Sequence, residues 1–199
     1  MAAGGALFSL RCGGSTQWYA AMVRCGGRIA FDLSESFDKK NKVLNRMDIV
    51  GTNGLQLLTV PLAKPHRQLS VGEVELSEHA NWRHTHWGAL FSAYGRTPYF
   101  DYFADDLQRL YFDMSLRTIA AFNLALHRLV VDFLDLPIEE VSAEECAEDW
   151  RDSVAGERIS ALPVESYEQI WEDKNGFLPG LSILDLLFNL GREAVFVLR

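Results

Sequence analysis

Histidine is the side chain that most often binds metals and transfers protons near neutral pH, and four of the five histidines lie close together in this chain. They are His66, His79, His84 and His86. On a helix, His84 and His86 would point about 200° apart, and no carboxylate or cysteine motif with metal-ligand spacing accompanies them. We therefore expect no metal at this cluster.

A polar, basic segment covers residues 35–46 and includes Lys40. Segments of this kind, set between two strands, often present binding residues on a rigid frame. Its lysines could bind phosphate or carboxylate, and Asn45 and Arg46, at the start of an expected strand, could point into a cleft. A solvated loop explains the same composition equally well.

A glycine-containing loop, Arg11-Cys12-Gly13-Gly14-Ser15-Thr16, stands between an expected strand and an expected helix. Backbone N–H groups at a helix N-terminus can bind an anion, although a tight structural turn is the commoner reason for such a loop. The chain has no GxSxG, P-loop or GxGxxG motif. The acidic pairs Asp105-Asp106 and Glu139-Glu140 are typical of solvated helix faces and caps.

Strands are expected mainly in the first third of the chain, where short apolar runs alternate with turn residues. Asn53-Gly54 indicates a tight hairpin turn. Residues 69–76 alternate apolar and polar side chains as a half-buried strand does. The expected strands are residues 6–10, 28–33, 46–50, 55–62 and 69–76.

Helices are expected in the rest of the chain, because the apolar period there changes to about 3.6 residues. Ser115 is the expected cap of a long helix that ends before Pro137, and we expect it at the centre of the core. The other expected helices are residues 15–23, 81–94, 98–112, 166–173 and a Ser182-capped helix that ends at Gly191, while residues 195–198 could return as a strand or pack as a tail.

Composition limits the classes of protein to which this chain can belong. The 199 residues are 48% hydrophobic with a net charge of −8, so the chain can bury a full core but offers no basic surface for nucleic acid. No apolar run is long enough to span a membrane, and no charged leader precedes the N-terminal apolar patch. Three unpaired cysteines fit a reducing compartment. We expect one cytoplasmic domain, residues 1–199, with a mixed α/β fold: a strand-rich N-terminal third packed with a helical C-terminal two-thirds.

Several blocks of the sequence together resemble the WbqC-like protein family. The blocks extend over nearly the whole chain, and the two most specific are residues 81–87 (NWRHTHW) and 181–191 (LSILDLLFNLG), the latter as found in Bacteroidetes-type members. The other matching blocks are Asn45-Arg46, residues 58–62, 71–76, Ala93-Tyr94, 97–100 and 177–179.

The resemblance implies a context more than a reaction, since the family is associated with loci for surface-polysaccharide (O-antigen) biosynthesis. One departure stands out. Family members typically carry a Tyr-Leu-Pro or His-Gln-Pro-Tyr type of motif after the first strand, where this chain has residues 11–16. If that motif carries catalysis in the family, this chain is altered there.

The resemblance and the residues together lead to a hypothesis: an acyl or aminoacyl transferase that acts on an amino or nucleotide-linked sugar. In it, Arg46 and Lys40 bind an anionic group and Asn45 lies beside them. His84 is the general base, because its ordinary pKa of about 6.5 suits proton transfer near neutrality. The helix of residues 81–94 contributes the remaining binding residues: Arg83 orients the substrate, and Trp82 or Trp87 packs on a ring.

Two other hypotheses stay open. One is a non-catalytic binding or scaffold protein of a polysaccharide-assembly pathway, in which the candidate residues would be scattered or buried. The other is a metal-dependent hydrolase, which would need His79, His84 or His86 to join carboxylates around one ion. A small-molecule sugar or acyl donor is the expected partner, and the sequence names no cofactor.

Overall fold

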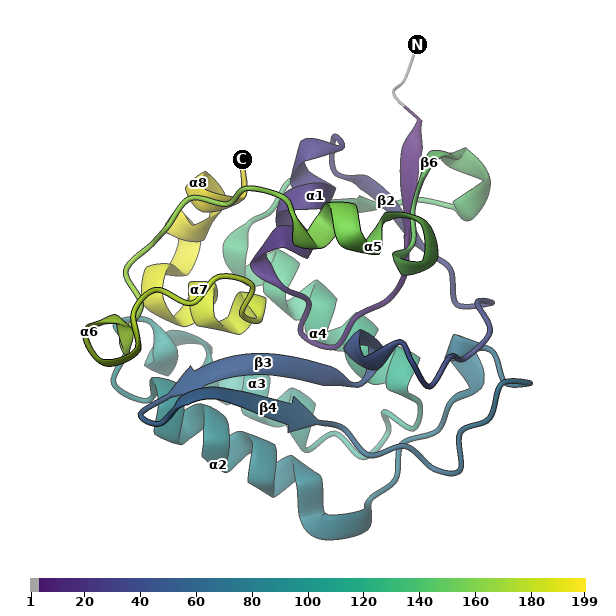
Figure 1. Cartoon of the computed structure of the whole chain (residues 1–199). Helices are drawn as coiled ribbons and strands as arrows, with labels where there is room; N and C mark the ends of the chain where they lie inside the picture. Colours follow the sequence, from purple (N-terminus) through teal and green to yellow (C-terminus); the bar gives the residue numbers. More distant parts are fainter. Residues whose placement is uncertain (1–3) are drawn as a thin grey trace.

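The computed structural model describes residues 4–199, and its centre is a parallel sheet of four short strands in the order β5-β2-β1-β6. A separate antiparallel hairpin, β3–β4, lies beside it, and helices surround both (Figure 1). The strands are β1 (Gly5–Phe8), β2 (Arg28–Phe31), β3 (Arg46–Gly51), β4 (Gly54–Thr59), β5 (Glu139–Glu140) and β6 (Cys146–Trp150).

The order of the sheet creates a reversal next to β1. From β1 the chain moves to β2 and β5 on one side, then returns to add β6 on the other side of β1. Ala6 is paired with Ile29 of β2 and with Glu148 of β6, and both pairings are parallel. In open parallel sheets, ligands bind outside the carboxyl ends of the strands at such a reversal. The segments that follow β1 and β6 are therefore the first place to look for a site.

The hairpin forms where the sequence predicts it. Gly51 is paired with Gly54 across the turn, and Gly54 has a φ of 95°, which a residue with a side chain rarely adopts. The register then runs without interruption to the pair Arg46 and Thr59. Helices α2 (Trp82–Tyr94) and α7 (Ile183–Leu190) both contact β3. The hairpin is thus a packed element rather than a free arm.

Side-chain caps explain where three helices begin. Ser15, Thr118 and Ser182 each accept a hydrogen bond from a backbone N–H two or three residues ahead. Helix α4 (Ile119–Leu134), at 16 residues, is the longest α-helix, and its inner face is buried in the core as predicted. The remaining α-helices are α1 (Thr16–Arg24), α3 (Phe100–Tyr111), α5 (Asp152–Ser160), α6 (Glu172–Asn175) and α8 (Ala194–Leu198).

The expected division into a strand-rich third and a helical remainder is wrong, because β5 and β6 lie between residues 139 and 150. The acidic pair Glu139-Glu140 is predicted as a solvated helix face or cap, but it forms β5. Backbone hydrogen bonds join this segment to β2 and its flanking residue: the N–H of Glu139 donates to the carbonyl of Gly27 at 2.8 Å, and the N–H of Val141 donates to the carbonyl of Ile29 at 2.8 Å. Both strands lie at the edges of the sheet, where polar side chains can stay in solvent.

Residues 69–76 do not form the predicted strand. Ser70 and Glu73 cap one another across a short turn at Val71–Glu73, which replaces extended backbone. Only isolated bridges remain on either side, and one of them joins Glu75 to Thr118. That bridge also keeps Thr118 extended, so α4 begins at Ile119 and not after Ser115 as predicted.

Two further boundaries differ near the C-terminus. Residues 166–173 are expected as a helix, but only α6 is helical, and residues 195–198 belong to α8. Among residues 4–199, no helix is both long and apolar enough to cross a membrane.

Candidate functional site

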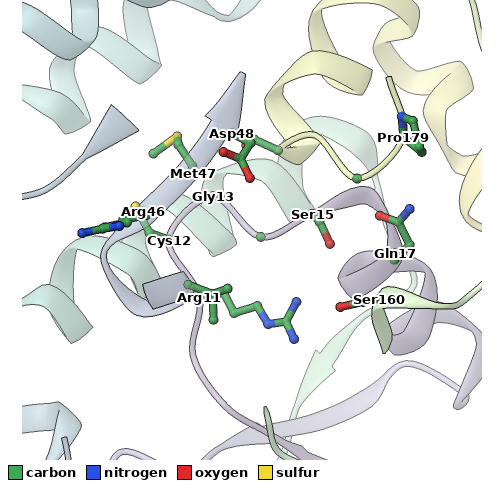
Figure 2. A pocket seen from close by; sticks show the side chains of 14 residues that line it. Arg11, Cys12, Gly13, Ser15, Gln17, Arg46, Met47, Asp48, Ser160 and Pro179 are labelled. Atoms are coloured by element: carbon green, nitrogen blue, oxygen red, sulfur yellow. The ribbon is translucent and has the colours of Figure 1, made fainter. Parts of the chain in front are cut away.

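A cavity of about 300 Å³ opens at the carboxyl end of β1, where the sheet order reverses. Most of its lining comes from the loop after β1, the first turn of α1, the start of β3 and the segment before α7. Val43, just before β3, and Ser160, at the end of α5, complete it. Figure 2 shows the side chains of Arg11, Asp48, Ser15 and Gln17 around this space. We call it the loop cavity.

The two glycines of the loop let it pack tightly against its neighbours. Gly13 has a φ of 47°, and a Cβ there would lie 2.9 Å from the Oγ of Ser182. A Cβ on Gly14 would lie 2.2 Å from the ring of Trp18, which is fully buried. Only glycine therefore fits at both positions, and backbone rather than side chains forms this wall of the cavity.

Free backbone donors line the same wall. The N–H groups of Gly13, Gly14 and Ser15 make no hydrogen bond to another residue within 4–199. Their neighbours are paired, since Cys12 donates to Val43 and Thr16 donates to Leu181. Consecutive free N–H groups at the N-terminus of a helix carry partial positive charge and bind anions well.

Gln17 adds an independent observation at the loop cavity. Its side chain is 7% exposed, yet its Oε1 has no hydrogen-bond partner among the described residues. A buried polar atom without a partner costs free energy. Because the amide can turn over, Gln17 can present either its oxygen or its NH₂ group to a bound molecule.

Arg11 is the cation that points toward the centre of the cavity in Figure 2, whereas Arg46 lines its edge and extends away in this view. The side chain of Arg11 is 7% exposed and is held by Asp152, through Nε at 3.0 Å and Nη2 at 2.5 Å from the same oxygen. Asp152 is the first residue of α5, directly beyond β6. The ion pair thus bridges the ends of the two strands between which the sheet reverses.

Two ionisable groups in the cavity differ in what they could do. Burial raises the pKa of the Asp48 carboxyl, and no ion pair involves it among residues 4–199. Burial also raises the pKa of the Cys12 thiol far above neutrality, so Cys12 stays protonated and is not a thiolate nucleophile. Asp48 is the side chain in the cavity that could accept a proton.

A second cavity, of about 380 Å³, lies on the other side of Asp152. Lys40 and Glu35 line it, and burial raises the pKa of the Glu35 carboxyl. Asn41, also in its wall, donates to the second oxygen of Asp152 at 3.2 Å. Arg11 lines the loop cavity and Asp152 lines the second one, so the ion pair connects the walls of the two cavities.

The residues predicted from the sequence are not brought together. Arg46 lines the loop cavity and Lys40 the second one. The amide of Asn45 donates to the carbonyl of Val60 at 2.8 Å and holds the base of the hairpin.

The predicted residues on α2 serve mainly in packing. Trp82 is 4% exposed and lies edge-to-face against Phe122. Arg83, 3% exposed, pairs with Glu78 at 2.9 Å and donates to the Tyr111 carbonyl at 2.6 Å.

Trp87 and His84 are the other two predicted residues on α2. Trp87 is half-buried against Phe100, with ring centroids 5.9 Å apart. His84 is exposed, packs on Phe112 and lines neither cavity. The role of His84 as general base stays a prediction, and neither of the two cavities reaches its side chain. Within residues 4–199, no three histidine, cysteine or acidic side chains are grouped as metal ligands would be.

The sequence predicts a possible anion-binding loop at residues 11–16, but it assigns no role to the side chains of Arg11, Gln17 and Asp48. A signal for two of them was present, because a glycine loop between a strand and a helix is a known anion-binding arrangement. Asp48 gave no signal, since its place beside the loop depends on the packing of the hairpin.

Fold and site together define an α/β protein with a cavity at the carboxyl edge of a parallel sheet. The chain belongs to the WbqC-like protein family, whose model matches residues 18–162. The loop cavity is built partly outside that range, from residues 11–17 and 179–182.

One curated relative is the uncharacterized protein Rv1507c of Mycobacterium tuberculosis (strain ATCC 25618 / H37Rv). It is 27% identical, and the match covers 78% of this chain and 80% of that protein. No solved structure is significantly similar to the chain.

Proposed function

We propose that the loop cavity binds the phosphate groups of a nucleotide-linked sugar, and that the protein is an enzyme of surface-polysaccharide biosynthesis that transfers an acyl or aminoacyl group to it. The observation that carries the proposal is the set of three free backbone N–H groups at Gly13, Gly14 and Ser15, placed with Arg11 around one cavity.

The charges and the shape both support a phosphate-bearing ligand. Backbone donors at a helix N-terminus and an arginine together suit a multiply charged oxyanion. The cavity, at about 300 Å³, is at the small end of ligand sites, and the second cavity beside it adds about 380 Å³. The diphosphate would lie at the loop, with the sugar directed past the Arg11–Asp152 pair toward the second cavity.

The association of the WbqC-like family with polysaccharide loci supports the biological part of the proposal. In the transfer, the sugar amine or hydroxyl attacks the acyl carbonyl of an activated acyl donor. The new amide or ester bond forms as the bond between the acyl group and its carrier breaks, and the carrier leaves. The attacking group must also give its proton to a base. Asp48 is suited to that role, because it lines the cavity and burial raises its carboxyl pKa toward the working range. In this proposal Asp48 takes the role first assigned to His84.

Thermal unfolding in the presence of inorganic pyrophosphate and of UDP-N-acetylglucosamine tests the binding step. A ligand at about 100 times its Kd raises the free energy of unfolding by about 2.7 kcal/mol, so both should raise the melting temperature of the wild type. The effect should shrink as salt is added, because the contacts are ionic.

Gln17→Glu is the decisive variant. It keeps the shape of the side chain and adds a negative charge to the cavity, so it should weaken pyrophosphate binding roughly tenfold or more. Arg96→Met is the control, since Arg96 is exposed and lies outside the cavity. Equal binding by the wild type and Gln17→Glu would exclude the loop cavity as the phosphate site.

A non-catalytic sugar-phosphate binding protein is the alternative, and one observation favours it. Burial keeps Cys12 protonated, and His84 lies away from the cavity. Among the residues that line the cavity, only Asp48 is then left as a proton acceptor, and a binding protein needs no such group. Asp48→Asn separates the two functions. If the protein is an enzyme, the variant should bind pyrophosphate roughly two- to fivefold more tightly, because a repelling charge is gone, and lose turnover.

A further inference from the structure

The helix that carries the NWRHTHW block borders another cavity, which the proposed function does not use. It measures about 360 Å³ and lies between β4 and the start of α2. It shares no residue with the loop cavity, although the two lie on paired strands: Leu57 in its wall is the cross-strand partner of Asp48. We call it the helix cavity.

His86 in its wall has an unused hydrogen-bond acceptor. The side chain is 3% exposed, and its Nε2 lies 3.0 Å from the carbonyl oxygen of Thr59. A carbonyl only accepts, so Nε2 carries the proton. Burial lowers the pKa of His86 to about 4, so the ring is neutral at pH 7. Its Nδ1 is then an acceptor, and it has no partner among residues 4–199.

Trp82, one helical turn earlier, has an unused donor. Its indole Nε1–H also lacks a partner within the described part of the chain, and the side chain is 4% exposed. The rings of Trp82 and His86 are 5.1 Å apart between centroids, edge to face. Two residues that line the helix cavity therefore carry a buried donor and a buried acceptor, both without partners.

We propose that the helix cavity binds the N-acylamino group of a small ligand. A secondary amide carries one acceptor and one donor, and in its trans form they point in opposite directions. The amide therefore lies between the two nitrogens, where its carbonyl accepts from the Trp82 indole and its N–H donates to Nδ1 of His86. Leu57, Pro61 and Ala80 provide an apolar lining for the acyl methyl group. A hydroxyl group, by contrast, has no methyl group that could pack against this apolar lining.

The entrance must open for the amide to reach these nitrogens, because both are covered in the unliganded chain. His79 and Thr85 are exposed at the edge of the helix cavity, next to a turn in which Ala80 and Asn81 have φ values of 64° and 49°. Left-handed backbone at residues with side chains costs free energy, so the amide displaces an edge that is already strained.

Amide ¹H–¹⁵N spectra of the full chain test the proposal directly. The probes are N-acetylglucosamine and N-acetylglycinamide, which carry the amide on a sugar and on a peptide unit, with glucose as the probe that lacks it. We expect either amide compound to shift the indole N–H signal of Trp82, which Trp82→Phe assigns, and glucose to leave it in place. The amide compound that binds more tightly shows whether the ligand's amide belongs to a sugar or to a peptide unit.

Variants give a second measurement. Trp82→Phe removes the donor and should weaken binding of the better amide roughly tenfold. Trp87→Phe, on the same helix but outside the helix cavity, is the matched control and should bind as the wild type does. If Trp82→Phe does not fold, Leu57→Lys changes an exposed lining residue and should block binding without touching the core.

The proposal is overturned if neither amide shifts the Trp82 indole signal, or if glucose shifts it equally. Pyrophosphate binding at the loop cavity is measured separately, so either site can fail while the other stands.

Discussion

At the scale of single residues, two buried histidines make the fold sensitive to acid. His127 is 2% exposed and stacks on Tyr19, with Nδ1 at 3.2 Å from the tyrosine hydroxyl. Burial lowers the pKa of His127 to about 4, as it does for His86. Each histidine therefore binds its proton less readily in the folded chain than in the unfolded one.

The sign of the pH dependence follows. Between pH 6.5 and about 4 the unfolded chain is protonated at His127 and the folded chain is not, so the free energy of unfolding falls as pH falls through this window. The loss at His127 should reach about 3 kcal/mol near pH 4 and be absent above about pH 7. Urea unfolding of the wild type and of His127→Gln across pH 4–7 measures it.

His127→Gln should have a flatter pH profile than the wild type, because its amide does not titrate. His84→Gln, at an exposed histidine, is the control. Parallel profiles for His127→Gln and the wild type would show that the pKa of His127 is the same in the folded and the unfolded chain.

At the scale of elements, a glycine in the loop before α1 and a glycine inside α2 should respond in opposite ways to the same substitution. Gly14→Ala places a methyl group 2.2 Å from the buried Trp18 ring and should destabilise the fold by about 1–3 kcal/mol. Gly88→Ala, in the middle of α2, meets nothing within 4 Å and should stabilise by up to about 1 kcal/mol, because alanine is the better helix former.

Thermal unfolding of both variants checks this pair, and each serves as the other's control for the effect of an added methyl group. Gly14→Ala should also lose pyrophosphate binding if the loop holds phosphate as proposed. A Gly14→Ala protein as stable as the wild type would mean that the loop does not pack on Trp18.

At the scale of the whole molecule, the Arg11–Asp152 ion pair joins the end of the first strand to the end of the sixth. The two residues are separated by 141 positions in the chain, and their side chains are 7% and 14% exposed. Removing one partner leaves a largely buried charge without its counter-charge. The pair therefore couples the two halves of the sheet and both neighbouring cavities.

Asp152→Asn should destabilise the fold by about 3 kcal/mol. Adding Arg11→Met to it should cost less than the sum of the single changes, because the stranded charge is then removed. Urea unfolding of the wild type, both single variants and the double variant gives the coupling free energy. Strict additivity would show that the pair is solvent-screened and does not connect β1 to α5.

Local pattern by itself determined much of this protein. Helical period and capping serines predicted α1, α2 and α7 closely, and Asn53-Gly54 predicted the hairpin turn. These features depend on residues a few positions apart, whose preferences act before any tertiary contact forms. The WbqC-like blocks, likewise local, were enough to identify the family, which the family model confirms.

Only the tertiary structure decided the parallel sheet and the cavities. Strands β5 and β6 are short and acidic, and they are strands because distant backbone groups of β1 and β2 pair with them. Arg11, Gln17 and Asp48 come together because the hairpin and the first loop pack side by side. Side-chain type can be read from the sequence, but which distant side chains share a cavity depends on long-range packing, and no local preference encodes that.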